Sequence, residues 1–387
     1  MKILENYATS AGVRIGKDPH EFPVNFHPIL GKYITISAKT GQPSKDYDYF
    51  QEVIKIIQPV LAKNGYWIIQ IGEMEEQKIP GCIFKLGLSF RESAYVVQNS
   101  SLHISGDSCF CHFAGHTKTP LLALYGSTSP SSTSPYWVGV FEALQGNSGL
   151  PSYEPQENDK EINKITPENI SDKIFEMLNI KARLNMRSIS FGRLYNNSMI
   201  SFIPDFEPEY SKLSNCKLFV RMDIYHNEEI VFNLLKFRNN PVSIITHIPL
   251  SENFLKAARS KVQRIIQTFK EGYKIEDLEN LKNSGIPYSL VWIGEKDHLP
   301  NVRLELFDFE AVGSRVVERD DRIKKDTLFT TKQFFLGRGK HYVSSWHYKH
   351  GIEELSSEVG REVGDALESD EFWESKDAFY FFEKINK

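Results

Sequence analysis

One stretch of the chain, residues 102–135, gathers residue types that can hold an anion. Asp107 and Ser108 stand directly before a short expected helix that carries His112, and their side-chain oxygens can cap it. The unpaired N–H groups at such a helix end form an anion site. A buried run, Leu121–Tyr125, then ends abruptly in Gly-Ser-Thr-Ser-Pro, and open α/β sheets bind ligands at such strand ends. The same pattern is also compatible with one more strand–helix–strand unit that binds nothing.

The segments around this stretch alternate between strand and helix patterns. Strands are expected at 32–37, 66–71, 83–86 and 102–105, and helices at 50–64 and 91–99. This order predicts a parallel sheet with helices on both faces, a Rossmann-like α/β domain over 32–180. Residues 1–31 form a lead-in segment, and a helix that begins at Thr166-Pro167-Glu168 closes the domain.

A second α/β domain is expected over 181–315. Its strands are predicted at 217–223, 242–247, 288–293 and 304–309, and its helices at 228–237 and 275–284. Five apolar residues recur at helical spacing and predict one amphipathic helix between these strands: Leu255, Ala258, Val262, Ile265 and Phe269. The charged and aromatic C-terminal region, 316–387, shows no pattern that predicts a fold.

Composition narrows the class of protein and its partners. The chain has 387 residues, 41% of them hydrophobic and 25% charged, with a net charge of −4, which is typical of a soluble globular protein without a nucleic-acid partner. Four scattered cysteines predict neither a disulfide framework nor a zinc site, and no metal or other cofactor is expected. No segment has the apolar length of a signal peptide or membrane span, so we expect a cytoplasmic protein with at most a peripheral membrane contact.

The motifs between 25 and 180 resemble the sugar-nucleotide-binding half of the heptosyltransferase family, glycosyltransferases of the two-lobed GT-B type. The matching segments, in order, are Lys45-Asp46-Tyr47, Gly72-Glu73, Asp107-Ser108-Cys109-Phe110-Cys111-His112-Phe113-Ala114, Pro120, Tyr125-Gly126 and Thr128-Ser129-Pro130.

Two features depart from the family pattern. Cys109 stands where the family has a glycine, and its Cβ narrows the approach of a phosphate to the backbone. In the family the acceptor lobe precedes the donor lobe, whereas here only residues 1–31 precede it. Either the domain over 181–315 supplies the acceptor lobe in permuted order, or the donor lobe stands without a catalytic partner.

The resemblance implies phosphate-binding roles for several matched residues. Lys45 would place a positive charge beside a phosphate, and Lys39 is the alternative residue for this role. Ser108 and Thr128 would add hydroxyl donors, and His112 would add a ring N–H. Outside the motif context, a loop lysine is usually a solvated surface charge and a histidine on a short helix is often a packing residue.

The two matched carboxylates imply sugar contacts rather than phosphate contacts. Asp107 would cap the helix and position the sugar, because a negative charge beside phosphate is unfavourable. Glu73, at a strand end, is a candidate for ribose or base contacts, or else an ordinary surface carboxylate.

If the second domain is the acceptor lobe, the catalytic base would come from it, because ionisable residues follow its expected strands. The candidates are Asp223, His226, His247 and Asp308. Asp223 ranks first because it ends an apolar strand, where a carboxylate is partly desolvated. We therefore predict Asp223 and His247 as catalytic residues, although each also has a purely structural interpretation.

The resemblance implies an enzyme of the hexosyl or heptosyl transfer class. It would transfer a sugar, with inversion, from a nucleotide-sugar donor to a glycan or lipid-linked saccharide acceptor. The alternative is a non-catalytic nucleotide-sugar-binding or assembly module that retains only the donor lobe, which Cys109 and the missing N-terminal lobe favour. A third possibility places all chemistry within 181–387. The basic aromatic stretch 338–350 would contact a polyanionic acceptor or simply face solvent.

Overall fold

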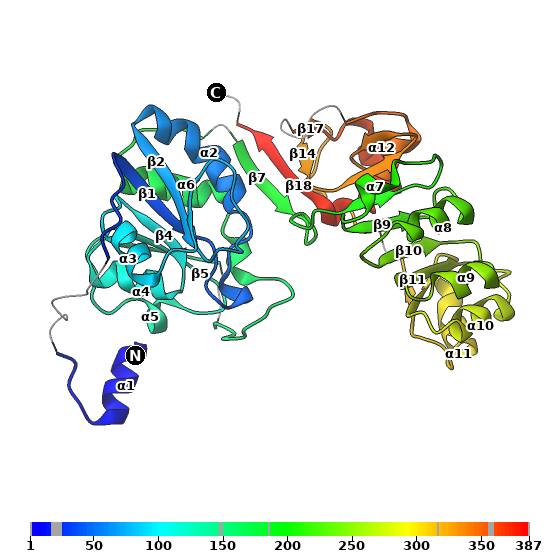
Figure 1. Ribbon diagram of the computed structural model, residues 1–387, viewed down its shortest axis with the longest axis horizontal. Coiled ribbons are helices and arrows are strands. Elements are labelled where there is room, and N and C mark those ends of the chain that lie inside the picture. Colours follow the sequence, from blue (N-terminus) through cyan, green and yellow to red (C-terminus); the bar gives the residue numbers. More distant parts are fainter. Residues whose placement is uncertain are drawn as a thin grey trace. The chain divides into compact units, whose positions relative to one another are not determined.

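The computed structural model describes residues 2–16, 25–146, 150–184, 186–315, 317–354 and 360–385. The chain divides into two compact units (Figure 1): unit 1 is Met1–Ser188 with Lys384–Lys387, and unit 2 is Ile189–Glu383. The division falls inside strand β7 (Met186–Phe191). Each unit has its own parallel sheet, so the predicted α/β fold with a second α/β domain is confirmed.

The sheet of unit 1 has the strand order β3-β2-β1-β4-β5-β6, and every pairing is parallel. Its strands are β1 (Lys32–Ser37), β2 (Tyr66–Gly72), β3 (Ile83–Leu86), β4 (His103–Gly106), β5 (Leu121–Tyr125) and β6 (Phe141–Gln145). Successive strands are added outward from β1 to β3, and the chain then returns to the other side of β1 with β4. The strand order therefore reverses between β1 and β4. Strand β6 was not predicted from the sequence.

Several helices of unit 1 begin at capping residues that the sequence supplies. They are α1 (Ile3–Ala11), α2 (Phe50–Lys63), α3 (Phe90–Gln98), α4 (Cys109–His116), α5 (Pro130–Thr133) and α6 (Pro167–Met177). Ser89, Ser108 and Thr166 accept a backbone N–H in the first turn of α3, α4 and α6. One face of the sheet packs with α3 and α4 into a single core that includes Val97, Ala114 and Ala123.

The main sheet of unit 2 has the order β13-β12-β11-β10-β9-β8-β15-β16. Its strands are β8 (Ile200–Phe202), β9 (Leu218–Arg221), β10 (Val242–Thr246), β11 (Val262–Phe269), β12 (Tyr288–Trp292), β13 (Val312–Ser314), β15 (Phe334–Gly337) and β16 (Lys340–Tyr342). All pairings are parallel except β15 with β16. Strands β8 to β13 are neighbours in chain order, and right-handed crossovers in one direction place the connecting helices on one face.

The connecting helices pack on that face over one apolar core. They are α7 (Tyr210–Leu213), α8 (Glu228–Lys236), α9 (Glu252–Ala258), α10 (Ile275–Asn283) and α11 (Leu299–Glu305). The core takes alternate residues of β9, such as Leu218 and Val220, so that Phe219 and Arg221 belong to the opposite face.

The helix predicted through residues 255–269 is wrong. Helix α9 ends at Ala258, and Val262–Phe269 is strand β11. The register against β10 shifts at Val242/Ser243, so β11 carries one extra residue at a bulge. Because of this bulge, Val262 and Ile265 face the same core although they are three residues apart. From Ile265 onward every second residue faces the core, so the next apolar core residue, Phe269, lies four residues later. Core residues spaced by three and then four positions are also what an amphipathic helix would show.

The strand predicted over 304–309 is also wrong. Helix α11 spans Leu299–Glu305, and the next strand, β13, begins only at Val312. Val302 and Leu306 are buried four residues apart, whereas Leu304 and Phe307 are 75% and 76% exposed. That is a helical burial pattern rather than an alternating one.

The C-terminal region forms a smaller antiparallel arrangement, for which the sequence predicted no fold. A four-stranded sheet has the order β17-β14-β18-β7, with β14 (Leu328–Thr331), β17 (Arg361–Glu362) and β18 (Phe379–Lys384). It packs with α12 (Ser345–Lys349) and α13 (Asp370–Trp373) around aromatic residues such as Phe329 and Phe372. Over the described parts of the chain, no helix is both long and apolar enough to cross a membrane.

Candidate functional site

The carboxyl ends of β1 and β4 bring two loops of unit 1 together. Ligands of open α/β sheets bind where the strand order reverses, which here is between these two strands. The loop after β1 carries Thr40 and Lys45, and the loop after β4 carries Asp107. Gly106 permits the close approach, since a Cβ there would lie 2.4 Å from the Lys45 carbonyl oxygen and 2.9 Å from Thr40 Cγ2.

Asp107 lies between two nitrogen donors at this point. Lys45 Nζ donates to Asp107 Oδ2 over 3.0 Å, and His112 Nε2 lies 3.4 Å from Oδ1. The exposed fraction is 5% for the Asp107 side chain, 19% for Lys45 and 43% for His112. The structure therefore brings together three residues predicted from the sequence. Burial alone would raise the pKa of Asp107, but the His112 contact and the Lys45 charge together lower it below its usual value.

Ser108 and Cys109 form the start of helix α4. Ser108 Oγ accepts from the Cys111 backbone N–H over 3.3 Å, which confirms Ser108 as the cap. The capping role predicted for Asp107 is wrong, because its carboxylate faces Lys45 and His112 instead. Cys109 is exposed at the first helical position. Its side chain occupies a position at which the family motif has a glycine, which has no side chain. Among the residues that the structure describes, no group of His, Cys, Asp or Glu is arranged to hold a metal ion.

The loop after β5 packs against the loop after β1. Ser127 Oγ donates to Ser44 Oγ over 3.0 Å, and a Cβ on Gly126 would lie 2.3 Å from the Ile162 backbone nitrogen. Thr128 is buried, and its Oγ1 has no hydrogen-bond partner within the described chain. A buried hydroxyl without a partner is uncommon in folded proteins.

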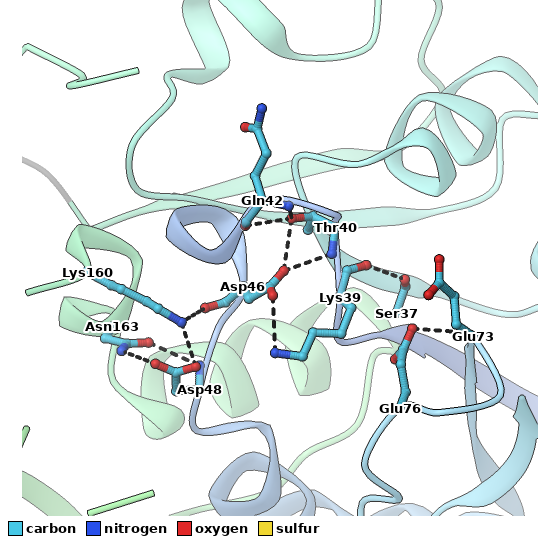
Figure 2. Close-up of polar contacts among 10 residues, drawn as sticks. All are labelled: Ser37, Lys39, Thr40, Gln42, Asp46, Asp48, Glu73, Glu76, Lys160 and Asn163. Atoms are coloured by element: carbon cyan, nitrogen blue, oxygen red, sulfur yellow. Dashed lines mark hydrogen bonds and ion pairs between the residues drawn. The ribbon is translucent and has the colours of Figure 1, made fainter. Parts of the chain in front are cut away.

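Lys39 and Lys45 lie on the same loop but have different partners, and Figure 2 shows Lys39 beside Asp46. Lys39 Nζ lies 3.1 Å from Asp46 Oδ2, and its side chain is 53% exposed. The other Asp46 oxygen accepts from the backbone N–H and hydroxyl of Thr40, over 2.8 and 2.9 Å. Asp46 thus braces the loop after β1 and holds Lys39, whereas Lys45 points at Asp107. Sequence analysis had no signal for this bracing role of Asp46.

Glu73 and Glu76 lie at the end of β2. Glu73 is exposed, and its backbone N–H donates to Glu76 Oε1 over 2.9 Å (Figure 2). Glu76 Oε2 is buried and has no hydrogen-bond partner among the described residues, and burial raises the pKa of this carboxyl group. A Cβ on Gly72 would lie 2.2 Å from Glu76, so the glycine makes room for it. Glu76 was not predicted from the sequence, in which only Gly72, four positions before it, gives a signal.

A second polar contact ties the loop after β1 to residues 160–163. Lys160 Nζ donates to Asp48 Oδ1 over 2.8 Å, and the Asn163 amide donates to Asp48 Oδ2 over the same distance. Lys160 also donates to the Asp46 carbonyl oxygen over 3.3 Å (Figure 2). These contacts fix the loop that carries Lys45.

In unit 2, three of the four candidate bases follow β9 or β10. Both oxygens of Asp223 accept from Arg221, each over 2.7 Å, so Arg221 occupies one acceptor position on each oxygen. His226 Nε2 lies 3.8 Å from Glu228, its Nδ1 is buried without a partner in the described chain, and burial lowers its pKa. His247 is exposed directly after β10.

Asp308 does not share this position. Because 304–309 is not a strand, Asp308 follows helix α11 instead of a strand end. It is exposed, and its carbonyl oxygen accepts from Lys282 over 2.9 Å. The argument that nominated it as a base is therefore wrong.

The basic residues of 338–350 are largely matched by carboxylates. Lys340 pairs with Glu353, and Lys349 Nζ lies 2.7 Å from Glu371. This stretch therefore presents little unbalanced positive charge to a polyanion.

An open parallel sheet with a lysine, a carboxylate and a capped helix at its strand-order reversal is typical of nucleotide-binding α/β domains. Residues 12–161 match the family model of glycosyltransferase family 9 (heptosyltransferase). The matched segment lies within unit 1, so the heptosyltransferase-like resemblance holds for this part of the chain. No curated protein matches the chain.

Several solved structures are similar over part of the chain. ADP-heptose LPS heptosyltransferase II of E. coli is 16% identical over 45% of this chain and 50% of that one, with a TM-score of 0.32. A family 9 glycosyltransferase of Veillonella parvula is 18% identical, with the same coverage and a TM-score of 0.33. The heptosyltransferase TibC in complex with ADP-D-β-D-heptose is 17% identical over 40% of this chain and 47% of that one, with a TM-score of 0.31. The chain thus spans about half the length of these structures.

Proposed function

We propose that unit 1 binds a nucleotide-activated sugar and that the chain is a glycosyltransferase. The observation that carries this proposal is the Lys45–Asp107–His112 group beside the start of α4, at the reversal between β1 and β4. The family match over 12–161 includes all three residues and supports the same proposal.

The chemistry of the group suits a leaving diphosphate. Lys45 supplies a positive charge, and the first N–H groups of α4 supply further donors, so charge that develops on the leaving phosphate is stabilised. A donor would draw Lys45 from Asp107 to a phosphate, and Asp107 would then accept a sugar hydroxyl. His112 adds a second donor beside Asp107. With these groups in place, we propose that transfer requires no bound metal.

For the remaining steps the proposal extends to unit 2. The acceptor is a glycan or lipid-linked saccharide, the transfer inverts the anomeric carbon, and the reaction takes place in the cytoplasm. Asp223 and His247, which follow β9 and β10, are the candidate bases. Glu73 and Thr128 complete the proposed donor contacts, with Glu73 on ribose or base and Thr128 on phosphate.

A non-catalytic nucleotide-sugar-binding module is the second candidate function. Two observations favour it: Cys109 occupies the glycine position of the motif, and Arg221 holds both oxygens of Asp223.

Incubation of the full-length chain with ADP-D-β-D-heptose and other nucleotide sugars separates the two functions. A transferase releases nucleoside diphosphate faster when a saccharide acceptor is added, and the release falls in the Asp223→Asn and His247→Gln variants. A binding module shows a thermal shift with the same ligands but no release. Absence of both binding and release would contradict both candidate functions.

A further inference from the structure

Unit 2 carries a charge cluster that the proposed donor site does not use. Arg221 lies at the end of β9, and Arg315 directly follows β13. Arg221 holds the two Asp223 oxygens from Nε and Nη2, and Arg315 Nη2 lies 2.5 Å from Glu374 Oε2. Arg221 and Asp223 are each 10% exposed, and Arg315 and Glu374 are 32% and 19% exposed. The cluster is thus partly buried but accessible from one side.

The two ion pairs interact electrostatically. Glu374, at the end of α13, interacts electrostatically with Arg221 and Asp223 as well as with Arg315. Burial raises the pKa of Glu374, and the two arginines oppose this effect. Residues from β9, from the end of β13 and from the end of α13 therefore lie within electrostatic range of Glu374, with Arg315 in direct contact with it.

The position of this cluster is one at which ligands bind. Arg221, Asp223 and Arg315 all lie at or just beyond the carboxyl ends of parallel strands, as the ligand contacts of α/β sheets do. The buried Arg221–Asp223 pair stabilises the fold little better than apolar residues of the same size would, and the partly exposed Arg315–Glu374 pair adds little more. Stability of the fold is therefore a weak reason for these four charges.

The hydrogen-bonding capacity of the cluster defines the class of ligand. Two guanidinium groups and two carboxylates cancel in charge, so neither a phosphate nor a cation finds an excess of opposite charge. The cluster still offers guanidinium N–H donors and carboxylate lone pairs. A hydroxyl group can accept from such an N–H and donate to such a carboxylate at the same time. Tyr225 lies two residues after Asp223 and is 48% exposed, and an exposed tyrosine ring can pack on the apolar face of a sugar.

We propose that unit 2 binds an uncharged saccharide at Arg221, Asp223, Arg315 and Glu374. That this saccharide is the acceptor rests on the proposed transferase function, whereas saccharide binding itself does not. Arg221 and Asp223 form the more buried part of the site, and Arg315 and Glu374 form its solvent-facing part.

Ligand-detected NMR on the full-length chain tests this site, with neutral methyl glycosides of glucose, galactose, mannose, N-acetylglucosamine and rhamnose as probes. We expect at least one methyl glycoside to bind, and to bind about tenfold more weakly to the Glu374→Gln and Arg315→Met variants, because each loses a charged hydrogen-bonding partner. The matched control is Arg319→Met, which removes the exposed Arg319–Asp370 pair near α13 and should leave binding unchanged. Glucose 6-phosphate should bind no better than methyl glucoside.

Three results would overturn the proposal: no methyl glycoside binds, only the phosphorylated sugar binds, or both variants bind as the unaltered chain does. Melting temperatures of the variants distinguish a lost site from a lost fold, and Glu374→Gln keeps the shape and an amide oxygen for Arg315. ADP binding, measured on the same samples, reports on unit 1 alone. Its absence would contradict the donor site and leave the saccharide site standing.

Discussion

Replacement of Lys45 by methionine tests the donor site directly. Methionine keeps much of the length and apolar stem of lysine but removes the charge that faces Asp107 at 3.0 Å. A hydrogen bond to a charged group contributes about 2 kcal/mol, which weakens ADP binding roughly 30-fold when it is lost. Bound ligand at about 100 times its Kd stabilises a protein by about 2.7 kcal/mol, and a 30-fold weaker Kd leaves about 0.9 kcal/mol. The rise in melting temperature with ADP should therefore fall to about a third.

Lys39→Met is the matched control for this experiment. Lys39 lies on the same loop and pairs with Asp46, but it is 53% exposed, so its ion pair contributes about 0–1 kcal/mol to stability. We expect this variant to keep the full ADP-induced rise. Calorimetric titration with ADP gives the Kd values independently. Equal loss in both variants, or no loss in Lys45→Met, would refute the assignment of Lys45 to a phosphate.

Two further predictions concern the helix start and the buried histidines. Ser108→Ala and Ser89→Ala each remove a helix cap and should each lower the free energy of unfolding by about 1 kcal/mol, but only Ser108→Ala should weaken ADP binding; equal ADP affinity in both would contradict a phosphate contact by Ser108. Burial lowers the pKa of His103, in unit 1, and of His347, in unit 2, to about 3. The unfolded chain binds these protons from about pH 6.5 downward and the folded chain does not, so stability should fall as pH drops through that range. Urea unfolding between pH 7 and pH 4 measures this, and a His103→Gln variant should show a smaller pH dependence; an unchanged dependence would argue against a neutral His103.

Local patterns in the sequence were sufficient for much of unit 1. The cap at Ser108, the helix that follows it and the buried run Leu121–Tyr125 depend on contacts within a few residues, and the structure confirms them. The resemblance to the heptosyltransferase family placed Lys45 with Asp107, although 62 residues separate them. In unit 2 the spacing of apolar residues predicted a helix where the structure has strand β11, because a bulge opposite β10 changes the spacing of the core residues of β11.

The sequence by itself therefore determined the alternating α/β order, the capped start of α4 and the kinds of side chain at the strand ends. Tertiary structure decided which of those side chains have partners. Lys39 pairs with Asp46 while Lys45 pairs with Asp107, and Glu76 accepts from the Glu73 backbone N–H. Arg315 pairs with Glu374, which lies 59 residues later in the chain. The physical reason is that caps and periodicity arise within one or two turns of chain. Ion pairs between loops depend on strand order and register, which no local pattern contains.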